Sequence, residues 1–146
     1  MNLPPRRRLS VLVADDSLPR RSYLRALINQ EPGLCLAAEA DTGATAIGLF
    51  FRFRPHIVLV HVCLPDSGGF DVLQCVKQAI PECVVIVLSA APDPCVEEVS
   101  RMLGATEVCH MGSGLNPLRE ALARAQRWLN PATADGSCHG SNPTCP

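Results

Sequence analysis

The apolar residues of this chain gather into five short, continuous runs separated by longer amphipathic stretches. The runs cover residues 9–14, 34–38, 56–62, 83–90 and 106–110. Runs that are continuous rather than alternating are typical of strands buried on both faces. In the stretches that follow each run, apolar residues recur at three- and four-residue steps. This spacing predicts helices over residues 18–30, 42–53, 69–79, 92–103 and 115–129.

The alternation of strands and helices predicts the fold class. Gly33, Pro55, Pro81 and Gly104 each stand just before a predicted strand, where a helix would end. Five strand–helix units with short connections predict an α/β fold, a doubly wound parallel sheet of five strands with helices on both faces. We expect an N-terminal arm over residues 1–8, one domain over 9–129 and a flexible tail over 130–146, where large apolar residues are missing.

Composition and charge narrow the class of protein. The 146 residues include 13 Lys+Arg and 14 Asp+Glu, a formal net charge of −1. This balance argues against bulk electrostatic binding to nucleic acid or to an anionic membrane. The apolar runs are far shorter than a membrane span. Six of the eight cysteines lie in or beside apolar runs, where free thiols behave as small buried hydrophobes, so we expect reduced cysteines and a cytoplasmic protein.

Candidate chemistry lies at the carboxyl ends of the predicted strands, where parallel α/β sheets form their sites. Asp15 and Asp16 close the first strand. Adjacent acids are costly to bury together unless a cation lies between them, and Mg²⁺ prefers carboxylate oxygens and water. The simpler interpretation is that Asp16 or Ser17 caps the next helix, although this accounts for one residue and not for both acids.

Several motifs at fixed spacings carry a family resemblance. They cover residues 11–17, 54–60, 64–70, 85–90 and 104–105. Together they resemble the receiver domain of bacterial two-component response regulators over residues 8–129. Residues 31–34 and 38–40 most resemble receivers of the NarL/LuxR type. The resemblance implies a flavodoxin-like fold with strand order 2-1-3-4-5 and a role in phosphorelay signalling. In this family an aspartate ending the third strand accepts a phosphoryl group from a histidine kinase, beside Mg²⁺ held by the first-strand acids.

The positions that perform the family's reaction are only partly retained. Asp15 and Asp16 match the acids, and Ser89 matches the hydroxyl residue that ends the fourth strand. The acceptor position holds His61 and the lysine position holds Met111; the position of the switching aromatic holds Val108. Imidazole cannot form an aspartyl phosphate and is a poor ligand for Mg²⁺. We therefore expect a degenerate, phosphorylation-independent receiver that is not an enzyme, requires no cofactor and holds Mg²⁺ weakly if at all.

Five further interpretations stay open for His61 and Asp66, one of them the phosphorylation of His61 itself. A protonated His61 could pair with Asp15 or Asp16 in place of the metal, or be no more than a tolerated polar residue. The same three side chains could instead form a transition-metal site. Asp66, five residues beyond His61, could act as an unconventional phosphoacceptor.

The expected partners follow from the resemblance. It points to signalling proteins, such as a histidine kinase or another regulator, that bind a face made of the fourth helix, fifth strand and fifth helix. Arg101, Met102, Arg119 and Trp128 belong to this face or adjoin it. A homodimer is a further alternative, whereas we expect no direct binding to nucleic acid or membrane. A small flavodoxin-like enzyme is disfavoured, because no glycine-rich phosphate loop follows the first strand.

Overall fold

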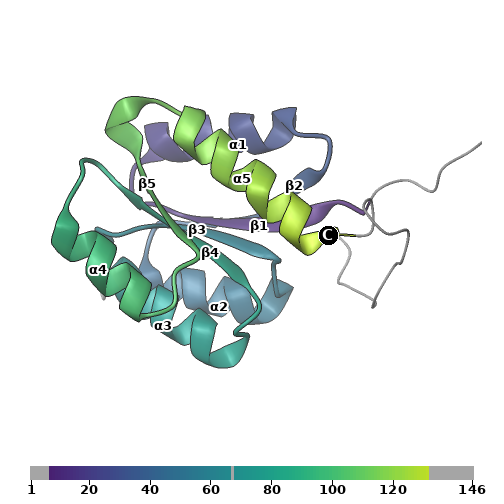
Figure 1. Cartoon of the computed structure of the whole chain (residues 1–146). Coiled ribbons are helices and arrows are strands. Elements are labelled where there is room, and N and C mark those ends of the chain that lie inside the picture. Colours follow the sequence, from purple (N-terminus) through teal and green to yellow (C-terminus); the bar gives the residue numbers. More distant parts are fainter. Residues whose placement is uncertain (1–6, 67, 132–146) are drawn as a thin grey trace, which may run out of the picture.

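The computed structural model describes residues 7–66 and 68–131, and its strands and helices alternate along the chain. The strands are β1 (Leu9–Ala14), β2 (Leu34–Ala40), β3 (Ile57–His61), β4 (Val84–Ser89) and β5 (Glu107–His110). The helices are α1 (Leu18–Gln30), α2 (Gly43–Phe53), α3 (Gly69–Ala79), α4 (Pro94–Met102) and α5 (Asn116–Leu129). All five strands are parallel, in the order β2-β1-β3-β4-β5, which confirms the expected flavodoxin-like fold (Figure 1).

The element boundaries differ from the predicted ones where local pairing decides them. β2 continues to Ala40 because that residue pairs with Ala14 of β1. α4 begins at Pro94 because Asp93 caps it, accepting a 2.9 Å hydrogen bond from the amide of Cys95. A short 3₁₀ turn over Met111–Ser113, which the apolar pattern did not predict, links β5 to α5.

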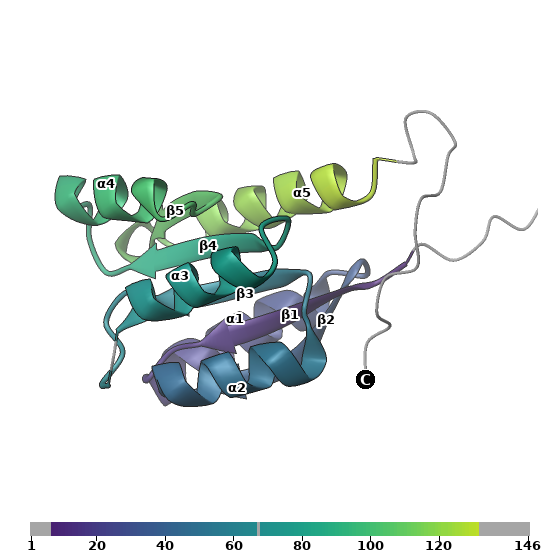
Figure 2. The same ribbon diagram turned by 90° about the horizontal axis from the view of Figure 1, so that it is seen from below.

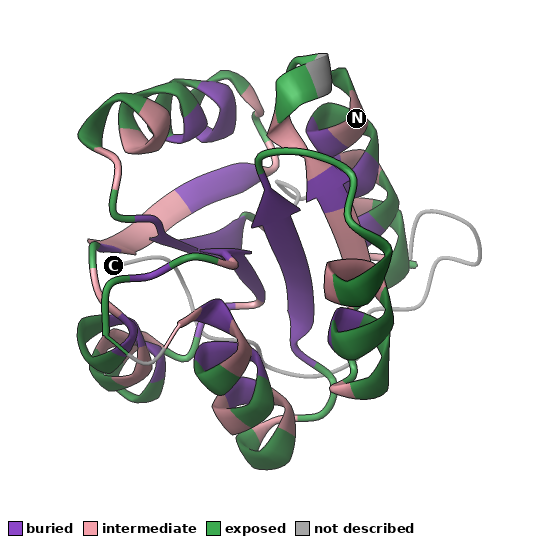
Figure 3. Cartoon of the chain, turned by 90° about the vertical axis from the view of Figure 1, so that its left-hand side faces the viewer, coloured by how far each residue is buried: buried purple, intermediate pink, exposed green. Residues whose placement is uncertain are grey.

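The helices form one layer on each face of the sheet (Figures 1 and 2). α1 and α5 cover one face, and their apolar residues pack with β1, β3 and β4, with Leu24, Leu27 and Leu122 among the buried residues. α2 and α3 supply the opposite core, where Phe50 and Val72 are fully buried. The inner strands β1, β3 and β4 are buried along their whole length, as continuous apolar runs require, whereas most residues of the edge strands β2 and β5 are half-buried (Figure 3). No helix of the described residues is long and apolar enough to cross a membrane.

The remaining expectations concern the chain termini and the redox state of the cysteines. Most of the predicted arm (1–8) and tail (130–146) lies outside the described residues. Among the described cysteines, Cys63, Cys75, Cys83, Cys95 and Cys109 are free thiols. Cys35 is disulfide-bonded, so the expectation of a reduced thiol is wrong there. Cys35 lies on β2, which is at the edge of the sheet, and burial in an apolar run did not by itself indicate its redox state.

Candidate functional site

The candidate site lies where the strands end at one edge of the sheet. β1 and β3 are neighbours, with Ala14 opposite Val60, so Asp15 and His61 follow at adjacent strand ends. β4 and β5 end beside them, with Ser89 opposite His110. The strand order therefore places at the same end of the sheet side chains that are up to 95 positions apart in the sequence, from residue 15 to residue 110. This arrangement was expected from the alternation of strands and helices.

Asp15 is fully buried, and Arg20 binds both of its carboxylate oxygens. Nε of Arg20 lies 2.8 Å from Oδ2, and Nη2 lies 2.9 Å from Oδ1. The same Nη2 lies 3.2 Å from Oδ1 of Asp16. The amide of Ser17 donates a further 2.9 Å hydrogen bond to Oδ1 of Asp15. One guanidinium thus binds both acids, and such bidentate, charge-assisted pairs are the strong ones.

The first turn of α1 places the guanidinium there. Ser17 is the N-cap, and its hydroxyl accepts a 3.3 Å hydrogen bond from the amide of Arg20. Pro19 occupies the first turn, where a missing N–H costs nothing. Arg20 is therefore in the first turn and folds back over Asp15. The hydrogen bond to Asp15 raises the pKa of the Arg20 guanidinium, with partial burial acting in the opposite direction.

Mg²⁺ does not fit the residues that surround Asp15 as they are arranged. Both oxygens of Asp15 already accept hydrogen bonds, and a cationic group lies against both acids. His61, which the resemblance places at the third ligand position, offers nitrogens, which Mg²⁺ disfavours relative to oxygen. Within residues 7–66 and 68–131, no three His, Cys, Asp or Glu side chains are grouped to hold a metal. The alternative of a transition-metal site made of Asp15, Asp16 and His61 is therefore wrong for this arrangement.

The hydrogen bond of His61 is made with the residue that follows its own strand end, and not with the acids. Its Nδ1 accepts a 3.1 Å hydrogen bond from the amide of Cys63. Its Nε2 is buried and has no hydrogen-bond partner among the residues that the structure describes. An accepting Nδ1 places the ring proton of a neutral imidazole on Nε2, an assignment that follows from these contacts. The expected pairing of His61 with Asp15 or Asp16 is thus wrong, because Arg20 supplies the positive charge that we assigned to His61.

The backbone at His61 is held closely against the start of α3. The amide of Gly69 donates a 2.9 Å hydrogen bond to the carbonyl oxygen of Val62. A Cβ atom at position 69 would lie 2.4 Å from the carbonyl oxygen of His61 and 2.9 Å from Cα of Val62. Both are backbone atoms, so any other residue at this position would displace the strand end. Gly69 therefore allows the end of β3, which carries His61, to lie directly against the start of α3.

Ser89, the family's hydroxyl residue, belongs to a hydrogen-bonded chain across three elements. Its Oγ lies 2.8 Å from Nδ1 of His110 on β5 and donates to the carbonyl of Ala91 at 3.1 Å. Nε2 of His110 lies 2.8 Å from Oε1 of Glu97 on α4. With Ser89 donating to Ala91, both ring nitrogens of a protonated His110 would act as donors. The hydroxyl is buried and committed to these partners.

The other two positions that the resemblance singles out pack against the cores. Met111, which we expect at the lysine position, packs against the core formed by the sheet with α1 and α5. Val108, which we expect at the position of the switching aromatic, packs against the core on the opposite face. A thioether in an apolar cluster offers no charge to a phosphate.

Asp66 is engaged at the beginning of α2. Its Oδ1 accepts a 2.7 Å hydrogen bond from the amide of Gly43, and its Oδ2 accepts a 2.9 Å bond from the amide of Ala44. These amides are among the four at a helix N-terminus that lack helical acceptors. The carboxylate also complements the positive end of the helix dipole. Asp66 therefore acts as a helix-terminal anion, a role that its sequence position did not reveal.

Sequence reasoning missed Arg20 and the partnership of His110 with Glu97. A signal for Arg20 was present, because an arginine four residues after Asp16 in a newly started helix faces back toward the strand end. His110 ends the last apolar run, but its partner on α4 depends on how that helix is placed against β5. No sequence spacing indicates that placement.

A five-stranded parallel sheet in this order, with two acids and a hydroxyl at its strand ends, is the arrangement expected of a receiver domain. A family model described as the response regulator receiver domain matches residues 11–122. The chain belongs to this family.

Its relatives include multidomain proteins. It is 35% identical over 81 residues to a protein-glutamate methylesterase/protein-glutamine glutaminase of Pyrococcus horikoshii, a match that covers 56% of this chain and 22% of that protein. It is 28% identical over 130 residues to the response regulator GacA of Pseudomonas aeruginosa, covering 86% of this chain and 60% of that protein. The chain thus spans under a quarter of the methylesterase and less than two thirds of GacA.

Solved structures agree on the fold. A LuxR-family two-component response regulator from Aurantimonas superposes with a TM-score of 0.78 at 21% identity, covering 83% of this chain and 86% of that one. The receiver domain of AraT from Geobacillus stearothermophilus gives a TM-score of 0.77 at 24% identity, covering 86% and 98%.

Proposed function

We propose that this receiver domain works without phosphorylation and signals through its contacts with partner proteins. The observation that carries the proposal is His61, which replaces the acceptor carboxylate and whose Nδ1 is held by the amide of Cys63. An acyl phosphate requires a carboxylate oxygen as nucleophile, and the imidazole has none. The apolar environment of Met111 adds support, because it leaves this position without a cation for phosphate.

The binding face that we propose is formed by α4, β5 and α5. Val99 and Met102 on α4 and Trp128 on α5 are large apolar side chains exposed to solvent, Met102 by 78%. A hollow of about 210 Å³ lies beside α4 and β5 and is lined by Glu97, Arg101, Ala105, Thr106, Glu107 and Val108. Exposed apolar residues bordered by charged ones are typical of protein contact surfaces. Signalling proteins such as a kinase or another regulator fit this face, and a second copy of the chain is the alternative occupant.

We assign the chain no enzymatic activity and no required cofactor. The match to the methylesterases spans a small part of those proteins, so their reactions do not transfer to this domain. Asp66 is the remaining candidate acceptor, and we propose that it does not react because both of its oxygens hold the start of α2.

Intact mass spectrometry after incubation with a small phosphodonor and Mg²⁺ tests the proposal. We expect no added phosphoryl mass, with a conventional receiver domain as the positive control for the donor. Phosphoryl mass that persists in His61→Ala and disappears in Asp66→Asn would overturn the proposal and identify Asp66 as the acceptor. Phosphoryl mass lost in His61→Ala would overturn it in favour of a phosphohistidine.

A further inference from the structure

We propose that Arg20 is the resident cation of this pocket, an internal guanidinium that occupies the place of a divalent ion and makes the domain independent of divalent metals. The juxtaposition that supports this is the contact of one guanidinium with both strand-end acids, at 2.8 and 2.9 Å to Asp15 and 3.2 Å to Asp16. This proposal goes beyond the proposed function and does not rest on it, because it concerns what neutralises the acids and not whether phosphoryl transfer occurs.

Burial explains why a cation is needed at all. Asp15 is completely buried, and a carboxylate removed from water without a partner is strongly destabilised. Its two oxygens receive three donors, two from Arg20 and one from the amide of Ser17. The carboxylate is thus satisfied by the chain itself, and an ion would have to displace these donors to reach it.

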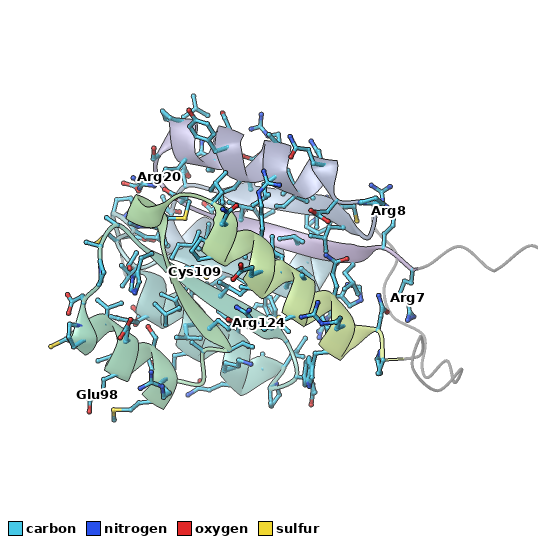
Figure 4. The ribbon with its side chains drawn as sticks, turned by 45° about the horizontal axis from the view of Figure 1, so that its top comes forward. Arg7, Arg8, Arg20, Glu98, Cys109 and Arg124 are labelled. Carbon is cyan, nitrogen blue, oxygen red and sulfur yellow. The ribbon has the colours of Figure 1, made fainter. Side chains whose placement is uncertain are left out.

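Charge balance points the same way. Asp15 and Asp16 together carry two negative charges, which match one divalent ion. The positive charge of Arg20 reduces the combined charge of these three side chains to one negative charge. An added divalent ion would therefore meet a weaker attraction and a repelling guanidinium. Arg21 increases this effect, since its Nη1 donates a 2.7 Å hydrogen bond to the backbone carbonyl of Asp15. Figure 4 shows Arg20 at the end of the molecule opposite Arg7 and Arg8, so the charge at the pocket is separate from that cluster.

Exposure shows that the guanidinium lies near the molecular surface and not in the core. The side chain of Arg20 is 36% exposed and that of Asp16 is 46% exposed, whereas Asp15 is inaccessible. Removing the Arg20 side chain would therefore open Asp15 to solvent and leave two adjacent carboxylates. Mg²⁺ is commonly bound by one or two carboxylates together with waters. Loss of Arg20 should create a divalent-ion site where the wild type has none.

Thermal unfolding of the full chain with MgCl₂ or with EDTA tests this prediction. We expect the midpoint of the wild type to be unaffected by Mg²⁺. Arg20→Ala should unfold at a lower temperature in EDTA and regain roughly 3–6 °C at a tenfold excess of Mg²⁺ over its Kd. Adding Asp15→Asn to Arg20→Ala should abolish this gain. If Arg20→Ala does not fold, Arg20→Gln keeps a hydrogen-bond donor without the charge and replaces it.

Arg25→Ala is the matched control. Arg25 lies on the same helix and makes an equivalent two-point contact with Glu39, at 2.8 and 3.0 Å, outside the pocket. Its loss should leave the midpoint insensitive to Mg²⁺. A wild-type midpoint that rises with Mg²⁺ as much as that of Arg20→Ala would overturn the proposal. So would an Arg20→Ala or Arg20→Gln protein that folds but shows no response to Mg²⁺. Because the readout is ion binding, its failure is distinguishable from a failure of the phosphorylation experiment.

Discussion

At the end of β3, a single side chain decides which reactions the pocket supports. A carboxylate there would offer an oxygen nucleophile and a hard metal ligand, whereas His61 offers two nitrogens. One nitrogen is held by the amide of Cys63, and the other is buried with no hydrogen-bond partner among the described residues. Arg20 adds a guanidinium that contacts both acids. Neither side chain is part of the apolar clusters, so the fold and the chemistry of the site have separate residue requirements.

The cysteines allow a prediction at the scale of single residues. Burial raises the pKa of Cys83 to about 12 and that of Cys109 to about 11. The thiolate is the reactive form, so both residues should resist alkylation at pH 8. Cys63 and Cys95 are exposed and should be alkylated first. Peptide mapping by mass spectrometry after a brief treatment of the native protein with iodoacetamide measures each site separately.

Repeating that treatment in denaturant provides the internal control, because all four thiols should then react at similar rates. Labelling of Cys83 in the native state as fast as that of Cys95 would contradict the burial of its thiol, whose Sγ lies 3.5 Å from the carbonyl oxygens of Pro55 and His56.

At the scale of elements, a polar contact attaches α4 to the sheet. Ser100 is the one residue of this nine-residue helix that is buried. Glu97 of α4 reaches His110 of β5, which in turn reaches Ser89 of β4. A helix with little buried surface depends more on such contacts, so His110 should set how firmly α4 is held beside the proposed binding face.

Glu97→Ala should therefore loosen α4. We expect a loss of about 0.5–1.5 kcal/mol in the free energy of unfolding, since the pair is partly exposed and solvent weakens it. Hydrogen exchange should become faster in α4 and stay unchanged in α1. The control is Glu98→Ala, the next residue of the same helix, which is exposed (Figure 4). Equal exchange rates in the two variants would show that the contact with His110 does not hold the helix.

Most elements could be predicted from the sequence, and the polar contacts between them could not. Continuous apolar runs and helical spacing indicate burial directly, so the predicted α1 and α3 agree with the structure at both ends. Asp66 is an example of a polar contact that the sequence pattern does not predict. Its contact with the amides of Gly43 and Ala44 joins residues more than 20 positions apart. Such a contact depends on loop geometry and on side-chain rotamers, which hydrophobic periodicity does not encode.

At the scale of the whole molecule, the carboxyl and the amino ends of the parallel strands carry different polar groups. The candidate site lies at the carboxyl ends, and His56 lies at the amino ends, just before β3. Nδ1 of His56 accepts a 3.0 Å hydrogen bond from the amide of Ser10, which links the beginnings of β1 and β3. Its Nε2 is buried and has no hydrogen-bond partner within residues 7–66 and 68–131. His56 is thus a basic group that the fold holds in an environment unfavourable to its charge.

The global stability should accordingly depend on pH through His56. Burial, with a smaller contribution from the charge of Arg7, lowers the pKa of His56 in the folded protein. The unfolded chain, with a histidine pKa of about 6.5, therefore binds the proton first as the pH falls. The contribution of a neutral His56 to the free energy of unfolding is fully present above about pH 6.5 and is lost as the pH falls toward and through the lowered folded pKa.

His56→Asn retains an acceptor for the amide of Ser10 but has no proton to gain. Urea unfolding between pH 7.5 and pH 5 should therefore show a shallower loss of unfolding free energy in the variant, because the other histidines and the carboxylates contribute equally to both proteins. Parallel pH profiles in the two proteins would mean that the folded state accepts a charged His56 without cost, which its buried and unpartnered Nε2 argues against.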